Sequence, residues 1–487
     1  MKRFWIILIA VFCVSGLSAK NLKAYLSYAT FNSPTDGPYV ETYLSVVGKT
    51  VQYIKNTDGK YQATVEILIV FTGKDSVKNF KKTDLMSPEI DDTTKVNITF
   101  MDQQRFVLPN GDYNMEIRIN DKNKPDAAPF KTKETLTINY PAGKIAVSGV
   151  ELVESYKEST TPTVLTKSGY DLVPFTINFY PSIMKNLTFY TEVYNTDTVF
   201  KADEKFLVDY YIESYETSKT IANYFKFKTF TSKKVIVILD EFDITELPSG
   251  NYVLVIEVKN KSNERVTYNQ VFFQRSNPGV TFNLADITSI DITNTFASKI
   301  TNIDTLKDFI KSTYPISTQL EKVFAENNMK KTDLKMLQQY FYNFWINRNA
   351  SDPEKSWMKY YVEVCKVNKF YSTSINKGYA TDRGRVYLQY GEPNTITESV
   401  SDPSAPPYEI WLYYSLQNQR NRKFVFYLPD LVTNEYELIH SDALGEFNNP
   451  SWQMQIMKRN TTTNNPDQLK PDDYFGGKAD DFFNHPH

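Results

Sequence analysis

Runs of alternating apolar and polar residues dominate the first 280 residues of the chain. Residues 25–31, 39–47 and 61–71 are three such runs, and the stretch NTDG at 56–59 separates the third from a run at 50–55. An alternation with a period of two places the apolar side chains of a strand on one face, and NTDG has the composition of a hairpin turn. Strands at this spacing, without helical periodicity, predict antiparallel β-sandwiches.

One segment of this β-rich region occurs twice. Residues 95–123 align without a gap to residues 234–262, with 8 of 29 positions identical. Both copies contain Leu-Pro-x-Gly-x-Tyr, at residues 108–113 and 247–252, directly before an alternating strand. A tyrosine at this place is typical of the tyrosine corner of immunoglobulin-like and fibronectin-like sandwiches, where its hydroxyl bonds to backbone. The repeat predicts two similar sandwiches in tandem.

We expect the first sandwich at residues 20–140 and the second at residues 144–280. The stretch YPAG at 140–143 is the expected joint, because proline and glycine interrupt strands. Modules of this kind present surfaces and set spacing more often than they carry chemistry. The strands expected in the second sandwich are 145–153, 175–179, 187–194, 207–212, 225–230, 235–239, 252–258 and 271–274.

Beyond residue 282 apolar residues recur at spacings of three and four, which is typical of helices. The sequence predicts helices at 304–311 and 319–326, a third capped by Thr332, and a fourth with Asp352 as its cap and Pro353 at its first position. Helices followed by strands predict an α+β domain with an antiparallel sheet. This domain is expected at residues 285–455, with strands at 385–390, 409–416, 423–427 and 435–440.

Residues 1–19 combine a basic start, an apolar run and a small-residue exit, which predicts a secretory signal peptide. No later segment is long and apolar enough to span a membrane. The net charge of −2 gives no attraction to nucleic acid. Beyond the signal, Cys365 is the one cysteine, so no internal disulfide is expected. Because it lies on the apolar stripe of the fourth helix, we expect a buried thiol.

Candidate catalytic chemistry is scarce. The chain has three histidines, His440, His485 and His487, so a Ser-His-Asp or Cys-His arrangement would depend on His440. No histidine or cysteine spacing of a zinc site occurs, nor a glycine-rich phosphate loop. We therefore expect no metal, no cofactor and no enzymatic activity.

Residues 378–394, GYATDRGRVYLQYGEPN, form a distinctive stretch of turns, arginines and acids. The stretch resembles the signature of the GWxTD domain, with Tyr379 in place of the tryptophan. The resemblance covers residues 340–455 and implies the architecture of Bacteroidota envelope proteins in which this domain follows β-sandwiches. Further matching segments, in the order and spacing of the family, are FWINR at 344–348, PYEIW at 407–411 and YELIHS at 436–441.

Two interpretations of this stretch follow from its residues. In one, Gly378 and Gly384 adopt positive φ and allow close backbone approach, while Asp382 caps or closes a turn. Arg383 and Arg385, two apart on an extended segment, then share one face.

A fork between an arginine and Glu392 would tie the two ends of the stretch into a structural clasp. In the other interpretation these side chains form the rim of a pocket, a docking surface or a catalytic site. The candidate residues are Tyr379, Asp382, Arg383, Arg385 and Glu392.

The last residues, 456–487, are polar and are expected to be disordered alone. Their aromatic side chains are candidates for docking into a partner: Tyr474, Phe475, Phe482 and Phe483.

We expect a non-enzymatic periplasmic scaffold or adaptor protein, associated with the periplasmic face of the outer membrane as a subunit of an assembly or secretion complex. One alternative is a glycan- or peptide-binding module, and the high aromatic content of 15% favours it. Another is a hydrolase with its site near Asp382, Arg383 and Glu392.

Overall fold

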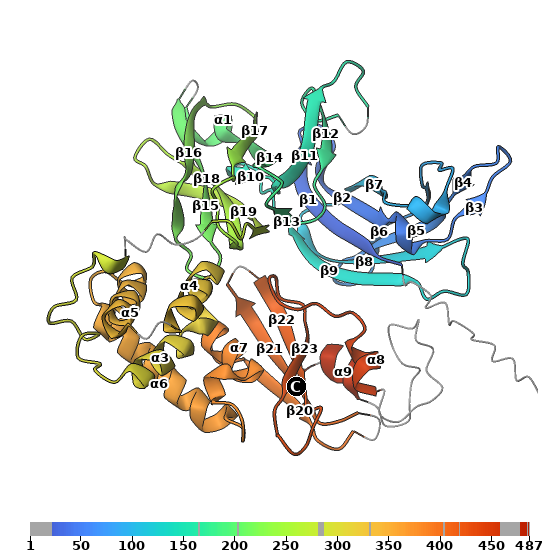
Figure 1. Ribbon diagram of the computed structural model, residues 1–487. Coiled ribbons are helices and arrows are strands. Elements are labelled where there is room, and N and C mark those ends of the chain that lie inside the picture. The colour runs from blue at the N-terminus through green and yellow to red at the C-terminus, as the bar shows by residue number, and fades with distance from the viewer. Residues whose placement is uncertain are drawn as a thin grey trace, which may run out of the picture.

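Two β-sandwiches and a C-terminal α+β domain follow one another along the chain and pack together (Figure 1). No helix among the described residues is long and apolar enough to cross a membrane. The predicted signal segment at 1–19 lies outside the described residues. The computed structural model describes residues 22–163, 166–201, 204–280, 287–330, 333–402, 405–417, 419–457, 478–484 and 486.

The first sandwich packs a sheet of strand order β1-β2-β7 against a sheet of order β6-β5-β8-β9. Alternate residues face the core between them, as in β5, where Val65, Ile67 and Ile69 are buried. A short hairpin of β3 and β4 turns at the predicted residues 56–59. The strands are β1 (Ala24–Ser33), β2 (Gly37–Val47), β3 (Ile54–Lys55), β4 (Tyr61–Gln62), β5 (Thr64–Thr72), β6 (Val77–Met86), β7 (Thr99–Val107), β8 (Gly111–Asp121) and β9 (Phe130–Ile138).

The second sandwich packs a sheet of order β10-β14-β11-β12, with β17 also paired to β14, against a sheet of order β13-β19-β18-β15-β16. The fibronectin-like class predicted from the sequence is thus confirmed for both modules. The elements are β10 (Ala146–Val147), β11 (Glu151–Glu158), β12 (Tyr170–Pro174), β13 (Phe179–Pro181), β14 (Asn186–Tyr194), α1 (Thr196–Val199), β15 (Lys205–Ser214), β16 (Thr220–Thr231), β17 (Val235–Asp243), β18 (Gly250–Lys259) and β19 (Arg265–Ser276).

The strand predicted at 175–179 is wrong in its bounds. The chain there leaves β12 of one sheet at Pro174 and enters β13 of the other sheet at Phe179. Because the segment crosses between the two layers, it cannot pair along its length with either sheet. Periodicity could not detect this crossing, since Phe175 still packs against the core.

The repeated Leu-Pro-x-Gly-x-Tyr segments form equivalent tyrosine corners. The Tyr113 hydroxyl donates to the carbonyl oxygen of Pro109 at 2.8 Å, and the Tyr252 hydroxyl donates to that of Pro248 at 3.0 Å. Both tyrosines stand near the start of the strand that follows the turn and are mostly buried. The internal repeat therefore corresponds to the same structural device in each sandwich.

The C-terminal domain has a four-stranded antiparallel sheet of order β20-β21-β22-β23 between two helical layers (Figure 1). Along β21, Trp411 and Tyr413 face α6 and α7, whereas Tyr408 and Ile410 face α8 and α9. Helices α3 to α6 form a further aromatic core. The elements are α3 (Ile303–Ser312), α4 (Gln319–Met329), α5 (Leu334–Arg348), α6 (Pro353–Tyr371), α7 (Asp382–Tyr390), β20 (Thr395–Ser399), β21 (Tyr408–Leu416), β22 (Gln419–Tyr427), β23 (Glu437–Ser441), α8 (Trp452–Met457) and α9 (Ala479–Asn484).

The structure confirms several helix signals and corrects two. Asp352 caps α6 by accepting from the Lys355 amide, and Pro353 stands at the first helical position. The cap of α5 is Asp333, while the predicted cap Thr332 lies outside the described residues. Cys365 is exposed on α6 and not buried, because it lies beside the stripe that contacts the core.

Direct contacts join the three modules. The sandwiches meet where Phe31 and Tyr43 of the first pack with Tyr190 of the second. Tyr215 of the second sandwich bonds to the C-terminal domain, accepting from Gln419 Nε2 at 2.9 Å and donating to the Leu444 carbonyl at 3.3 Å. Hydrogen bonds with long sequence separation thus hold the sandwiches and the sheet of the last domain together.

Candidate functional site

The turn stretch begins with a close approach between backbones. A 3₁₀ turn at Gly378–Ala380 packs on α6, and α7 follows it directly. A Cβ at Gly378 would lie 2.2 Å from the carbonyl oxygen of Val367, and a Cβ at Gly384 would lie 1.8 Å from that of Gly378. Neither glycine has positive φ within this stretch, so that part of the expectation is wrong. The glycines serve the predicted close approach instead.

Thr381 and Asp382 start α7 and attach it to the sheet. Thr381 is the N-cap, accepting from the Gly384 amide at 3.2 Å and donating to the Gly378 carbonyl at 2.8 Å. The Asp382 carboxylate accepts from the Leu438 amide of β23 at 2.7 Å. Asp382 therefore also places a negative charge at the helix N-terminus, where the helix dipole favours it.

The strand predicted at 385–390 is helical, since these residues belong to α7. The stretch VYLQY fits both periods over so short a length, and the glycine packing against α6 decides between them. Positions two apart on a helix point about 200° apart. Arg383 and Arg385 therefore do not share a face, contrary to the expectation, and each has its own partner.

Arg383 pairs with a buried carboxylate on β21. Its Nη1 donates to Glu409 Oε1 at 2.6 Å, and Trp411 Nε1 donates to Glu409 Oε2 at 2.9 Å. The guanidinium lies 4.0 Å from the ring centroid of Tyr436, while its Nε is buried without a hydrogen-bond partner among the described residues. Burial raises the pKa of Glu409, although Arg383 opposes the rise. This clasp joins α7 to the sheet.

Arg385 makes the two-bond fork expected of an arginine, but with a different acid. Its Nη1 and Nη2 each donate to one oxygen of Glu446 at 2.8 Å, and the Tyr390 hydroxyl donates to the same carboxylate at 2.8 Å. Glu446 follows β23 and is 61 residues away in sequence. The fork therefore attaches α7 to the segment after the sheet, which is stronger than a single charged contact.

Glu392 does not take part in the arginine clasp. Its side chain is 71% exposed, and its ion pair is with Lys366 of α6 at 3.3 Å. The predicted fork between an arginine and Glu392 is wrong, because Arg383 and Arg385 point to acids on the sheet side. Neither Glu409 nor Glu446 was a predicted site residue, and only three-dimensional proximity identifies them.

Tyr379, which replaces the family tryptophan, is buried against α3. Its hydroxyl donates to Asp308 Oδ1 at 2.7 Å, and Lys377 Nζ contacts the same oxygen at 2.7 Å. Burial, together with Asp308, raises the pKa of Tyr379 well above its ordinary value. The Tyr379 hydroxyl thus forms a hydrogen bond to α3. Tryptophan has no hydroxyl and could donate only from its indole N–H, which lies at a different place on the ring.

The chain's remaining candidate residues pack on the opposite side of the sheet. His440 is buried, its ring stacks with Trp452, and its Nδ1 accepts from the Asn449 amide at 3.1 Å. Phe483 of α9 packs on both rings, with Phe482 at the edge of the same cluster. Phe482 and Phe483 therefore pack against their own chain. The prediction that this part of the tail is disordered alone and docks into a partner is wrong for α9. Tyr474 and Phe475 lie outside the described residues.

No cluster of three or more metal-ligating side chains occurs among the described residues. Two of the hollows among the described residues lie where modules meet. One, of about 690 Å³, lies between the sandwiches and includes Tyr140 and Tyr268 in its lining. The other, of about 480 Å³, lies between the second sandwich and the C-terminal domain and includes Tyr215, Phe272 and Gln419.

A second candidate surface lies on β16, which sequence analysis treated only as a strand. β16 is an edge strand that pairs with β15 alone among the described strands. Phe225 and Phe227 point to the outer face and are 50% and 63% exposed, while the alternate Lys226 and Lys228 pair with Asp240. We call Phe225 and Phe227 the β16 patch. The alternating FKFK sequence is the signal from which it could have been found.

Comparisons with known proteins identify one part of the chain. The family model described as GWxTD domain matches residues 287–459. No curated protein matches the chain. These residues coincide with the helices and the sheet that hold the two arginine clasps.

Solved structures similar to this chain include fibronectin(III)-like modules of Clostridium thermocellum CbhA, with a TM-score of 0.15 and 11% identity over 50% of this chain and 89% of that chain. A mutant of Salmonella alpha-2-macroglobulin has a TM-score of 0.17 and 12% identity over 52% of this chain and 16% of that chain. Salmonella alpha-2-macroglobulin reacted with methylamine has a TM-score of 0.16 and 14% identity over 53% of this chain and 17% of that chain. At these TM-scores the likenesses carry no inference about function. The family match and the fold together make this chain a GWxTD domain-containing protein, in which the GWxTD domain follows two β-sandwiches.

Proposed function

We propose that this protein is a non-enzymatic scaffold or adaptor of the periplasmic cell envelope, associated with a protein complex at the periplasmic face of the outer membrane. The observation that carries the proposal is the β16 patch. An edge strand offers unpaired backbone groups, and proteins normally protect such edges with charges, bulges or cover. β16 carries two such charges, Lys226 and Lys228, but two large aromatic side chains also stand exposed on this edge strand.

The lysines and the phenylalanines of β16 point to opposite faces of the sheet. Lys226 and Lys228 are paired with Asp240 on the inner side, and the outward side chains at 225 and 227 are both rings. On the neighbouring strand β15, the residue opposite Phe227 is Asp209, which is paired with Lys259. Tyr211 of β15 stacks on Phe225 with ring centroids 5.9 Å apart, which supports the ring from the side of the sheet. A partner strand added at this edge would gain backbone hydrogen bonds and two aromatic contacts.

The packing of the three modules supports the scaffold role. The ion pair between Lys167 and Glu41 joins the two sandwiches, and the hydrogen bonds of Tyr215 join the second sandwich to the last domain. These contacts fix the position of the sandwich that carries the β16 patch. The expected secretory segment at 1–19 supports the compartment. The arginine clasps position α7 against the sheet.

The alternatives have less support. A glycan-binding module would need an exposed aromatic platform; every tryptophan among the described residues is buried, and exposed tyrosines such as Tyr156, Tyr268 and Tyr414 would have to provide it. A hydrolase near Asp382, Arg383 and Glu392 would need an open pocket. Asp382 and Arg383 are engaged with the sheet, Glu392 lies apart from them, and neither hollow described above includes these residues.

The test is affinity capture of the tagged full chain from envelopes in mild detergent. We expect stoichiometric recovery of an outer-membrane protein with the wild type and its loss with the double variant Phe225→Asp, Phe227→Asp. The control is Phe370→Asp on α6, where an exposed phenylalanine of similar exposure lies in another module. Recovery of the protein alone with the wild type, or equal capture by the double variant, would contradict the proposal.

A further inference from the structure

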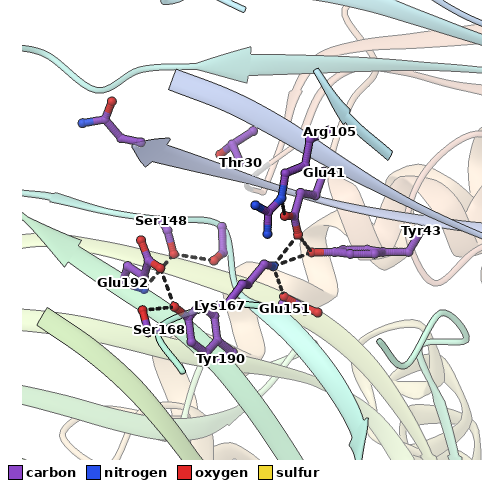
Figure 2. A network of polar contacts seen from close by, with 12 residues as sticks. Thr30, Glu41, Tyr43, Arg105, Ser148, Glu151, Lys167, Ser168, Tyr190 and Glu192 are labelled. Carbon is purple, nitrogen blue, oxygen red and sulfur yellow. Dashed lines mark hydrogen bonds and ion pairs between the residues drawn. The ribbon is translucent and has the colours of Figure 1, made fainter. Parts of the chain in front are cut away.

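A buried lysine lies between two glutamates at the junction of the sandwiches (Figure 2). Lys167 stands just before β12, and Glu151 begins the neighbouring strand β11. Glu41 reaches the same place from β2 of the first sandwich. Lys167 is 4% exposed, Glu151 2% and Glu41 0%, and the Lys167 Nζ contacts Oε2 of both glutamates. An amine and two carboxyl groups thus meet in a space without bulk water.

Aromatic rings enclose this amine. The Lys167 Nζ lies 4.1 Å from the ring centroid of Phe31 and 5.5 Å from those of Tyr43 and Tyr190. It donates to the Tyr43 hydroxyl at 3.0 Å. Removal from bulk water disfavours the charged form of a buried carboxyl group. Neutral amine and neutral acid are the pair that can form an amide.

The two carboxyl groups differ in how they are held. Glu41 bonds through Oε1 to Arg105 Nε and accepts through Oε2 from the Tyr43 hydroxyl at 2.6 Å, so both of its oxygens are occupied. Glu151 contacts Lys167 through Oε2, but its Oε1 is buried and has no hydrogen-bond partner among the described residues. A buried carboxylate with an unsatisfied oxygen is costly. Glu151 therefore gains most from losing its charge.

The protonation of the two acids follows from these contacts. Burial raises the pKa of Glu151, although Lys167 opposes the rise. Burial also acts on Glu41, but Lys167 and Arg105 hold its pKa below the ordinary value. Glu151 is therefore the acid that carries a proton more readily, and Glu41 is the carboxylate that can accept one from the ammonium.

We propose that Lys167 and Glu151 condense to an intramolecular amide cross-link, with Glu41 as the proton-transfer group. Glu41 takes a proton from the Lys167 ammonium and passes it to the Glu151 carboxylate, and the amine lone pair then attacks Cδ of the acid so formed. The new bond is Nζ–Cδ, and the bond that breaks is Cδ–O. The attacking nitrogen gives up one further proton, which Glu41 transfers to the departing hydroxyl so that it leaves as water. One ammonium and one carboxylate become one amide and one water, without an oxidant or reductant.

The cross-link would join β11 to the loop before its partner β12. Because Glu41 and Tyr43 come from the first sandwich, the bond would form only after the two sandwiches have packed. Cys13 and Cys365 are the two cysteines of the chain, and Cys13 belongs to the predicted signal segment. The amide would therefore give the mature chain a covalent tie that it cannot obtain from an internal disulfide.

The experiment is a tryptic peptide map of the purified, denatured full chain by mass spectrometry. Without the cross-link, trypsin gives separate peptides 145–157, 158–167 and 168–185. With it, cleavage after Lys167 is blocked, and peptide 145–157 appears joined to 158–185 with the mass of one water missing. Fragment spectra must place the bond at Glu151 and Lys167. This readout does not depend on where the N-terminus is processed.

Three variants and an internal control test the assignment. Lys167→Met and Glu151→Leu remove one bonded partner each, and Glu41→Gln leaves both partners but removes the proton acceptor. All three are expected to give the uncross-linked map, with circular dichroism confirming that they fold. Lys259, which pairs with Asp209 at a less buried position, should remain uncross-linked in the wild type. Separate peptides in the wild-type map would overturn the proposal even if every variant misfolds. A cross-link that persists in Glu151→Leu would overturn the assignment to Glu151.

Discussion

Gly384→Ala should destabilise the GWxTD domain, although alanine is the better helix former. Gly384 lies in the first turn of α7, where the helix meets the turn at Gly378 and the side of α6. An alanine Cβ there would lie 1.8 Å from the carbonyl oxygen of Gly378 and 2.7 Å from Cγ1 of Val367. The first obstacle is backbone, which cannot move aside like the end of a flexible side chain.

Two opposing effects set the size of the change. Alanine gains about 1 kcal/mol over glycine within a helix. Overpacking a close contact costs about 1–3 kcal/mol, and a backbone obstacle favours the upper end of that range. The expected net loss is about 2 kcal/mol in the free energy of unfolding. At about 2–4 °C per kcal/mol for a domain of this size, the melting temperature should fall by about 4–8 °C.

Tryptophan fluorescence during thermal unfolding isolates the relevant domain. Every tryptophan except Trp5 of the predicted signal lies in the C-terminal domain. The control is Gly279→Ala at the end of the second sandwich, followed by calorimetry, because nothing lies within 4 Å of a Cβ at Gly279. The control should change stability by less than about 0.5 kcal/mol. A melting temperature of Gly384→Ala equal to or above that of the wild type would refute the close-packing argument.

Three further predictions test the corners, the fork and the buried histidine. Tyr113→Phe and Tyr252→Phe each remove one hydrogen bond from a hydroxyl to a carbonyl oxygen, so calorimetry should show a loss of about 1 kcal/mol in the unfolding free energy of each sandwich. Losses that differ from each other by more than about 1 kcal/mol would contradict the equivalence of the two corners. Arg385→Lys loses the two-bond fork and should cost about 1–2 kcal/mol in urea unfolding, whereas Glu392→Gln, at an exposed pair, should cost less than about 0.5 kcal/mol; equal effects would contradict the clasp. Burial lowers the pKa of His440 from 6.5 to about 4, so the unfolded chain binds more protons between these values and stability should fall as the pH falls from 6.5 to 4. His440→Gln should reduce the difference between urea midpoints at pH 7 and pH 5, and an unchanged difference would count against a neutral buried histidine.

Several features followed from local sequence because local physics decides them. Alternation with a period of two predicted most strands of both sandwiches, since one face of each strand must be buried. Asp352 and Pro353 marked the start of α6 because capping and a fixed φ act within one turn. The repeated tyrosine corner was also predictable, because its hydroxyl bonds to backbone only four residues upstream.

The candidate site was only partly predictable. The sequence singled out Tyr379, Asp382, Arg383 and Arg385, and each of them makes a specific contact that positions α7. It could not provide their partners, which stand on other elements far along the chain. It also placed Glu392 in the clasp, where the structure has an exposed ion pair with α6.

The amino-acid sequence by itself determined the order of the modules, most of their strands and helices, and the corners that repeat between sandwiches. Only the tertiary structure decided that residues 385–390 are helical, because a short stretch fits both periods until the glycines pack against α6. Only the tertiary structure, too, brought Lys167 to Glu41 across 126 residues (167 − 41). Burial and partner choice are properties of packed surfaces, and no local pattern of residues contains them.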